Sequence, residues 1–196
     1  HDALPILSRG VSRGEAHPVP DAPTPSLMIP LASEHTGYTT DSQPVLWFYL
    51  SDPWPGKIEF TVNETGAPEP VFETWIDGPA KSGIYPIRLS DYKVILKPDV
   101  EYEWFLAIVQ DPQERSGDFL ASATIRYVPP AQAVSQQLQG VSKDKSYYVY
   151  AKDGYWYDSI ASVSALISEK PDDPIFKAHR AALLKQVGLS KAASDK

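Results

Sequence analysis

The sequence predicts a mainly β protein: an antiparallel β-sandwich followed by a tail of three or four short helices. Between Val45 and Val128, apolar residues recur with a period of two, in short runs separated by turns rich in Pro, Gly and Asp. After Val128 the apolar spacing becomes helical. No segment of helix length separates the β runs, which favours a sandwich over a parallel sheet.

The strand pattern is clearest in KIEFTV (57–62). Alternate residues from Ile58 to Val62 are apolar and those between them are polar, as in a half-buried antiparallel strand. PVLWFYL (44–50) is apolar on both faces, which predicts a central strand. Pro86 inside another run marks an edge strand or a bulge. The predicted strands are 44–50, 57–62, 71–76, 83–89, 101–110 and 119–128.

The segment LKPDVEY narrows the class of sandwich. Leu96, Pro98 and Tyr102 have the L-x-P-x-x-x-Y spacing, which resembles the tyrosine corner of fibronectin type III and related Greek-key domains. In that corner the tyrosine hydroxyl bonds to the backbone upstream. The resemblance makes 101–110 the strand after the corner and 119–128 its hairpin partner. We therefore expect an immunoglobulin-like or fibronectin type III-like sandwich.

The segment DPQERSGD (111–118) joins these two strands and is predicted to be a hairpin loop. Arg115 lies near Asp111 and Asp118 in sequence, which predicts ion pairs that brace the loop. Presentation of the same residues to a partner is the alternative. Asp111, Glu114 and Asp118 could also collect calcium ligands, although they lack the spacing of a known calcium loop.

Capping signals place the helices of the tail. Pro130 lies near the first turn of a short helix that ends at Gly140. Asp173 caps the last helix, which ends at Gly188 with Leu189 placed for the apolar contact that follows a C-terminal glycine. The predicted helices span about 130–140, 142–153, 156–169 and 174–188.

The segment KDGYWYDSIASVSALISEKPDD resembles a tetratricopeptide unit. Gly154, Trp156, Ser159 and Pro171 stand at the spacing of that repeat. One such unit cannot bury its own apolar faces, so we expect the helices to dock on the sandwich or on a partner. Tyr155, Trp156 and Tyr157 are predicted to attach the helix to the sandwich, or alternatively to form a protein-binding patch.

Three segments taken together resemble one protein family. TTDSQPVLWFYL, EYEWFLAIVQDPQERSGD and AKDGYWYDSIASVSALISEKPDD, in this order, are similar to the bacterial family called domain of unknown function 928, over about residues 36–190. The resemblance implies a protein that is exported in many members. It implies no reaction and no catalytic residue.

The first 35 residues are predicted to form an extended arm, because prolines interrupt every short apolar run in them. The predicted domains are thus the arm (1–35), the sandwich (36–128) and the helical tail (129–196). The chain starts with His1, and removal of a signal peptide is one interpretation. Apolar arm residues could add as an extra strand to the open edge of another sandwich. These residues are Leu4, Ile6, Leu7, Leu27 and Ile29.

Composition and motifs argue against several classes of function. The net charge of −7, with scattered basic residues, disfavours nucleic acid or an anionic membrane surface as partner. The absence of cysteine excludes disulfides, thiolate metal sites and a cysteine nucleophile. No apolar run approaches the roughly 18–20 residues that span a bilayer. HExxH, GxSxG and glycine-rich phosphate loops are also absent, so we expect no enzyme, no cofactor and no metal.

Two hypotheses about function follow. The first is a non-enzymatic, exported bacterial protein, periplasmic or extracellular, whose arm docks on a neighbouring sandwich and so builds a filament. The second is an extracellular module that binds glycan or protein as a monomer. In the second, Trp54 would be an exposed ring for sugar stacking, although packing against its neighbouring prolines is the alternative. An enzyme of unrecognised type comes third.

Overall fold

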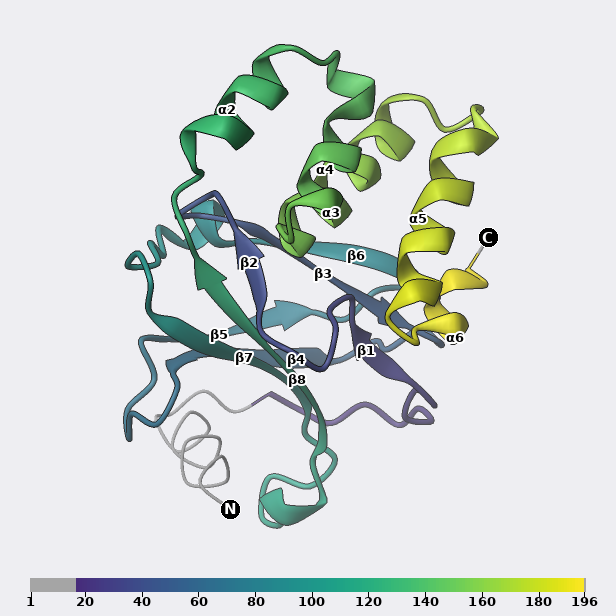
Figure 1. Cartoon of the computed structure of the whole chain (residues 1–196). Coiled ribbons are helices and arrows are strands. Elements are labelled where there is room, and N and C mark those ends of the chain that lie inside the picture. The colour runs from purple at the N-terminus through teal and green to yellow at the C-terminus, as the bar shows by residue number, and fades with distance from the viewer. Residues whose placement is uncertain (1–16, 196) are drawn as a thin grey trace.

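The computed structural model describes residues 17–195. Two sheets face each other, and the helices gather on one side of them (Figure 1). The three-stranded sheet has the order β1-β3-β6, and the five-stranded sheet has the order β2-β8-β7-β4-β5. The strands are β1 (Met28–Pro30), β2 (Gly37–Thr39), β3 (Val45–Leu50), β4 (Lys57–Glu64), β5 (Phe72–Asp77), β6 (Gly83–Arg88), β7 (Glu101–Ile108) and β8 (Phe119–Tyr127).

The predicted fold class is confirmed, and each of the six predicted strands is present within two residues of its expected bounds. The sequence did not predict β1 and β2. Each has three residues, which is too short for a period of two to be visible. β1 pairs antiparallel with β3, whereas β2 pairs parallel with β8.

The core lies between the two sheets. Apolar side chains of β3 and β6 meet those of β4 and β7 there, and most are almost completely buried. Pro86 of β6 stands opposite Trp47, and β6 is an edge strand of the three-stranded sheet. An edge strand has one unpaired side, so it tolerates a residue that lacks a backbone N–H. The core includes Leu46, Phe48, Ile58, Phe60, Val62, Ile87, Trp104 and Leu106.

The segment before β7 has the geometry of a tyrosine corner. The Tyr102 hydroxyl accepts a hydrogen bond of 3.0 Å from the Lys97 backbone N–H, five residues upstream. Leu96 and Tyr102 are buried in the core, and Pro98 forms an isolated bridge with Tyr127 of β8. The corner therefore fixes how the chain enters β7.

The tail contains α2 (Gln132–Gln139), α3 (Ser146–Lys152), α4 (Trp156–Glu169), α5 (Pro174–Gln186) and a short unpredicted helix, α6 (Ser190–Ala193). Asp173 caps α5 through a bond of 3.1 Å from the Ile175 N–H to its carboxylate. Gly188 adopts a φ of 81° after that helix, and the Leu189 N–H returns to the Leu184 carbonyl at 2.9 Å.

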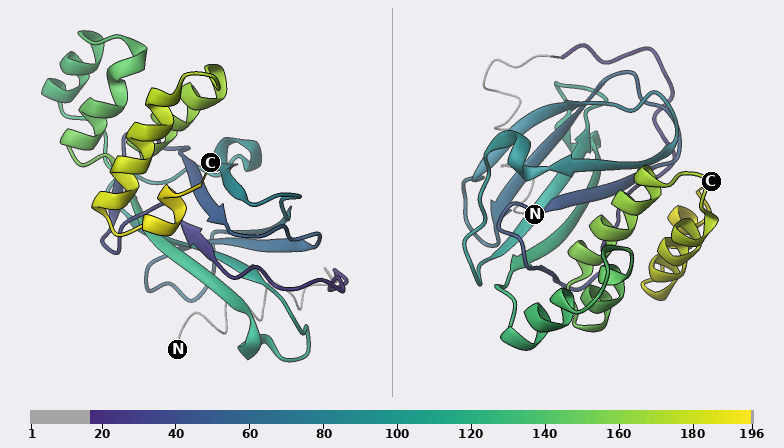
Figure 2. Two further views of the ribbon diagram at one scale, coloured as in Figure 1. Left: turned by 90° about the vertical axis from the view of Figure 1, so that its right-hand side faces the viewer. Right: turned by 90° about the horizontal axis from the view of Figure 1, so that it is seen from above.

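The helices dock on the outer face of the three-stranded sheet. Leu31 and Trp47 from the sandwich pack there with Ile160 of α4, Leu184 of α5 and Ala192 of α6. The tail thus forms a third layer, while residues 17–27 run along another side of the sandwich (Figure 2). Across residues 17–195, no helix has both the length and the apolar character needed to cross a bilayer.

Candidate functional site

Residues 28–31 of the arm are part of the sandwich of the same chain. The ladder between β1 and β3 places Met28 opposite Leu50 and leaves Met28 only 5% exposed. The Leu31 N–H donates to the Trp47 carbonyl at 2.8 Å just beyond the ladder. The predicted boundary at residue 36 therefore falls after the first strand rather than before it.

Side-chain bonds hold the segment that precedes β1. The Ser26 N–H donates to an Asp52 carboxylate oxygen at 3.0 Å, and the Gln110 side-chain amide donates to the Thr24 hydroxyl at 2.8 Å. Both bonds lie at exposed positions. Further toward the N-terminus, a Cβ at Gly56 would stand 2.9 Å from Pro20, so the glycine lets the arm approach closely.

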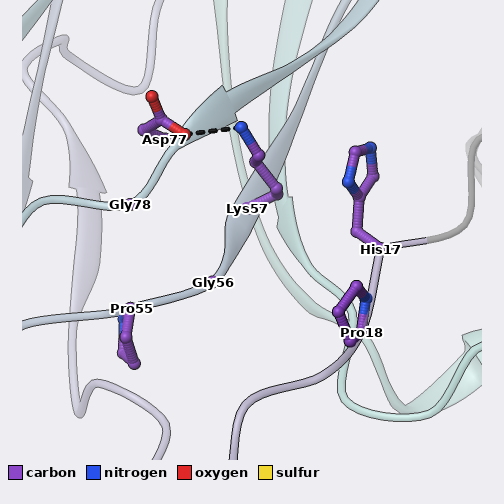
Figure 3. A pocket seen from close by; sticks show the side chains of 7 residues that line it. All are labelled: His17, Pro18, Pro55, Gly56, Lys57, Asp77 and Gly78. Carbon is purple, nitrogen blue, oxygen red and sulfur yellow. Dashed lines mark hydrogen bonds and ion pairs between the residues drawn. The ribbon is translucent and has the colours of Figure 1, made fainter.

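The first described arm residues form one wall of a pocket of about 350 Å³ (Figure 3). His17 and Pro18 face the turn before β4 and the end of β5, where Lys57 and Asp77 form an ion pair of 2.5 Å. The His17 ring also packs on Trp75 of β5, with 4.7 Å between ring centroids. We call the surface that holds residues 17–31 the arm seat; it runs from β3 to β5.

Of the predicted arm contacts, Leu4, Ile6 and Leu7 lie outside the described residues. Leu27 and Ile29 are half-buried on their own sandwich, where the Leu27 carbonyl accepts from the Ser51 N–H at 3.0 Å. These two side chains are therefore not a free surface in this conformation.

A buried charged cluster lies on the outer face of the five-stranded sheet. Arg115 bonds Asp118 at 2.6 Å, as the loop sequence suggested, and also bonds Glu59 of β4 at 2.9 Å. The Glu59 and Asp118 side chains are 1% and 0% exposed. The alternating pattern of β4 suggested a solvent-facing polar side, and that expectation is wrong for Glu59 and Thr61, which are both buried.

Burial dominates the electrostatics of this cluster. It raises the pKa of Glu59 to about 7, although the Arg115 charge and hydrogen bond act in the opposite direction. Burial also raises the pKa of Asp118, again opposed by Arg115. The cluster braces the β7–β8 loop on its buried side. Glu59 belongs to β4, so the sequence of the loop alone could not reveal it.

The other loop acids do not join this cluster. Asp111 is exposed and accepts from the Gln113 N–H at 2.9 Å, while Glu114 accepts from the Ser116 hydroxyl. Asp118 instead points inward to Arg115. Within residues 17–195, no group of three or more acidic or histidine side chains is arranged to hold a metal ion.

Trp54 is buried in the core. The expected exposure of its ring is wrong, because the side chain is 2% exposed and its indole N–H donates to the Lys57 carbonyl at 3.2 Å. A sugar has no ring face to stack on there. The Trp54 side chain instead belongs to the core cluster between the sheets.

Three consecutive residues at the start of α4 attach the tail to the sandwich, and the third of them, Asp158, accepts hydrogen bonds from Thr39 and Thr40. The Trp156 indole N–H donates to the Leu31 carbonyl at 2.8 Å. The Tyr157 hydroxyl accepts from the Trp104 indole at 3.0 Å and donates to the Thr124 carbonyl at 2.9 Å. We call residues 156–158 the tail joint.

The neighbours of the tail joint show how closely it fits. A Cβ at Gly37 of β2 would stand 2.6 Å from the Tyr157 ring, so only glycine fits at that position. Burial raises the pKa of the Tyr157 hydroxyl. Tyr155, by contrast, is buried inside the tail with Val134 and Val149. Neither Tyr155 nor Trp156 forms an open protein-binding patch here.

These features define an immunoglobulin-like sandwich with a fixed helical tail and an arm lying in a surface seat. The chain belongs to the family described as Domain of Unknown Function (DUF928), whose model matches residues 8–196. That match covers essentially the whole chain and confirms the resemblance found in its sequence. No curated protein matches the chain.

Proposed function

We propose that this is a non-enzymatic, exported structural or interaction protein that assembles by exchange of its N-terminal arm between copies. In the assembled form, residues 17–31 of one copy occupy the arm seat of the next. The export part of the proposal is supported by the family resemblance. The assembly part is supported by the way the arm is attached.

The observation that carries the proposal is that the arm joins the sandwich as an edge strand flanked by exposed hydrogen bonds, with Met28 and Leu31 as its buried side chains. β1 is an edge strand, and the bonds of Ser26 and Thr24 lie at the surface. A second copy could offer the same partners without any change in them. Exchange of an identical element between copies is a common route to assembly because each contact is replaced by its equivalent.

The hinge for such an exchange is the connection between β1 and β2. Its residues, 32–36, form bends rather than strand or helix. If extended, five residues reach at most about 18 Å, enough to carry the arm away from its own seat. Each copy donates one arm and offers one seat, so copies join head to tail into a filament unless two of them close reciprocally into a dimer.

The lack of native cysteine makes the exchange directly testable. Positions 26 and 52 continue the β1–β3 register, and the Asp52 carboxylate already reaches the Ser26 backbone. The variant with Ser26→Cys and Asp52→Cys should therefore form a disulfide across the seat. We expect a ladder of covalent oligomers on a non-reducing gel after oxidation at high protein concentration.

The matched control places the pair at Lys57→Cys and Asp77→Cys, which stand opposite each other within the β4–β5 hairpin. This control should remain monomeric in every case. Quantitative closure of the 26–52 disulfide within single chains, with no ladder, would overturn the exchange. That result would favour a monomeric binding module, and Trp54 could not be its glycan platform.

A further inference from the structure

A second cavity, also of about 350 Å³, lies where the turn after β2 meets helices α3 and α4. Its walls include Thr40 and Asp41 from the sandwich and Tyr150 and Asp158 from the tail. Small side chains of α4, such as Ala161, leave the space open. Cavities between packed units with a few convergent polar groups are common ligand sites. This one is distinct from the arm seat.

The carboxylates in this cavity are not balanced by an ion pair. Asp158 accepts from the Thr39 hydroxyl at 2.8 Å and from the Thr40 N–H at 2.6 Å, and these are neutral donors. Among residues 17–195, no salt bridge to Asp158 or to Asp41 is formed. Burial raises the pKa of Asp158, and the nearby charge of Asp41 raises it further. A positive charge in the cavity would offset both effects.

The basic residue of the described lining does not supply that charge. Lys143 pairs with Glu169 at 2.7 Å, and both side chains are largely exposed. Its ion pair is thus with Glu169 and not with Asp41 or Asp158.

Tyr150 adds an aromatic wall beside the carboxylates. Burial raises the pKa of its hydroxyl, and the charges of Asp158 and Asp41 raise it as well. Tyr150, Asp41 and Asp158 all line the same cavity. An aromatic face combined with carboxylates complements an organic cation better than a neutral or anionic group.

We propose that this cavity binds the guanidinium or ammonium group of an organic cation carried on a short aliphatic stem. Asp41 and Asp158 would hold the charge, Tyr150 would lie against it, and Ala161 would leave room for the stem. The volume is at the lower end of the range for small-molecule sites, which fits a group the size of an arginine side chain. The inference does not depend on arm exchange.

The test uses the full chain, uniformly labelled with ¹⁵N, and two probes of nearly equal shape. N-acetyl-arginine amide carries the cation, and N-acetyl-citrulline amide is its neutral isostere. We expect the arginine probe to shift the amide resonances of Thr40, Tyr150 and Ala161 in a saturable way. The citrulline probe should leave them in place. Equal shifts from both probes, or none at these amides, would overturn the inference.

Variants assign the binding to the cavity. Asp41→Asn at an exposed position should weaken the arginine probe about fivefold, as expected for loss of one partly solvated charge. Asp172→Asn, in an exposed turn of the tail, removes the same charge elsewhere and should have no effect. If both variants weaken the probe equally, the binding is a response to net charge and the site is refuted.

The role of the aromatic wall has its own pair of variants. Tyr150→Phe keeps the ring and should bind the arginine probe nearly as well as the natural chain, whereas Tyr150→Leu should bind it several-fold more weakly. A loss in the phenylalanine variant equal to that in the leucine variant would contradict ring stacking. Unshifted resonances elsewhere in the spectrum report that each variant is folded.

Discussion

The sandwich carries two appendages that are attached in different ways. The tail is held by a buried contact in which the Tyr157 hydroxyl bonds both Trp104 and Thr124. The arm is held by one edge strand, by the buried side chains of Met28 and Leu31, and by exposed bonds such as Ser26 to Asp52. Water competes for exposed bonds, so their net contribution is small. The difference supports the proposal that the arm can separate from the sandwich while the tail stays fixed.

The largest expected effect comes from breaking the tail joint. Tyr157→Ala removes a ring that is 2% exposed and leaves the Trp104 indole N–H and the Thr124 carbonyl without this partner. We expect the free energy of unfolding to fall by about 3–5 kcal/mol, as for other buried aromatic truncations. Urea denaturation followed by tryptophan fluorescence measures it.

The control for that variant is Tyr148→Ala. Tyr148 is 51% exposed and stacks on Tyr147 at the surface of the tail. Its loss should cost less than about 1 kcal/mol. If the two tyrosine variants have equal effects, the joint at Tyr157 is not what fixes the tail.

A smaller effect should separate the arm from the fold. Met28→Asp places a charge where the Met28 side chain is 5% exposed, and we expect the arm to leave its seat at a cost of about 2–3 kcal/mol. Hydrogen exchange should then show lost protection in residues 27–31 and unchanged protection in β4. Loss of protection in both places at once would mean that the arm is integral to the sandwich.

The buried cluster beside the arm seat predicts a dependence of stability on pH. The folded-state pKa of Glu59, about 7, lies above the ordinary value of 4.5. Its contribution is therefore fully present below about pH 4.5 and is lost as the pH rises through 7. We expect the free energy of unfolding to decrease by up to about 3 kcal/mol over that interval. Asp118, whose pKa is also raised, acts with the same sign.

Glu59→Gln should flatten this profile, because the amide cannot ionise. Denaturation at a series of pH values between 4 and 8 checks it. Glu64→Gln is the matched control on the same strand, where the partner Lys97 is mostly exposed, and it should leave the profile unchanged. A profile in Glu59→Gln as steep as that of the natural chain would refute the role of Glu59.

The smallest effect tests the hydrogen bond from Trp156 of the tail to Leu31 at the end of the arm. Trp156→Phe keeps a ring but loses the donor to the Leu31 carbonyl. We expect a loss of about 1 kcal/mol in the free energy of unfolding. A loss as large as that of Tyr157→Ala would show that the arm and the tail form one unit.

Periodicity made most of the fold predictable. A period of two placed six strands, and capping residues placed α4 and α5 nearly to the residue. It could not find β1 or β2, because three residues carry no visible period. The confirmed edge position of Pro86 shows that a single residue with a clear physical constraint can be as informative as a whole run.

The candidate site was predictable only where it is local in sequence. Arg115 and Asp118 lie three residues apart, so their pairing could be expected, whereas Glu59 joins them from 56 residues away. The bond between Trp104 and Tyr157 likewise spans 53 residues. For Trp54 the expectation from the sequence is wrong. Its flanking prolines suggested an exposed ring, but the side chain is buried in the core. Contacts between distant segments leave no mark in one sequence.

The central claim, that the arm can be exchanged between copies, is tested most directly by mixing two single-cysteine variants. One carries Ser26→Cys on the arm, and the other carries Asp52→Cys on the seat. After unfolding, joint refolding and oxidation, the account predicts a covalent heterodimer whose disulfide joins positions 26 and 52 of different chains. The absence of this heterodimer, while the double variant closes its disulfide within single chains, would contradict the account.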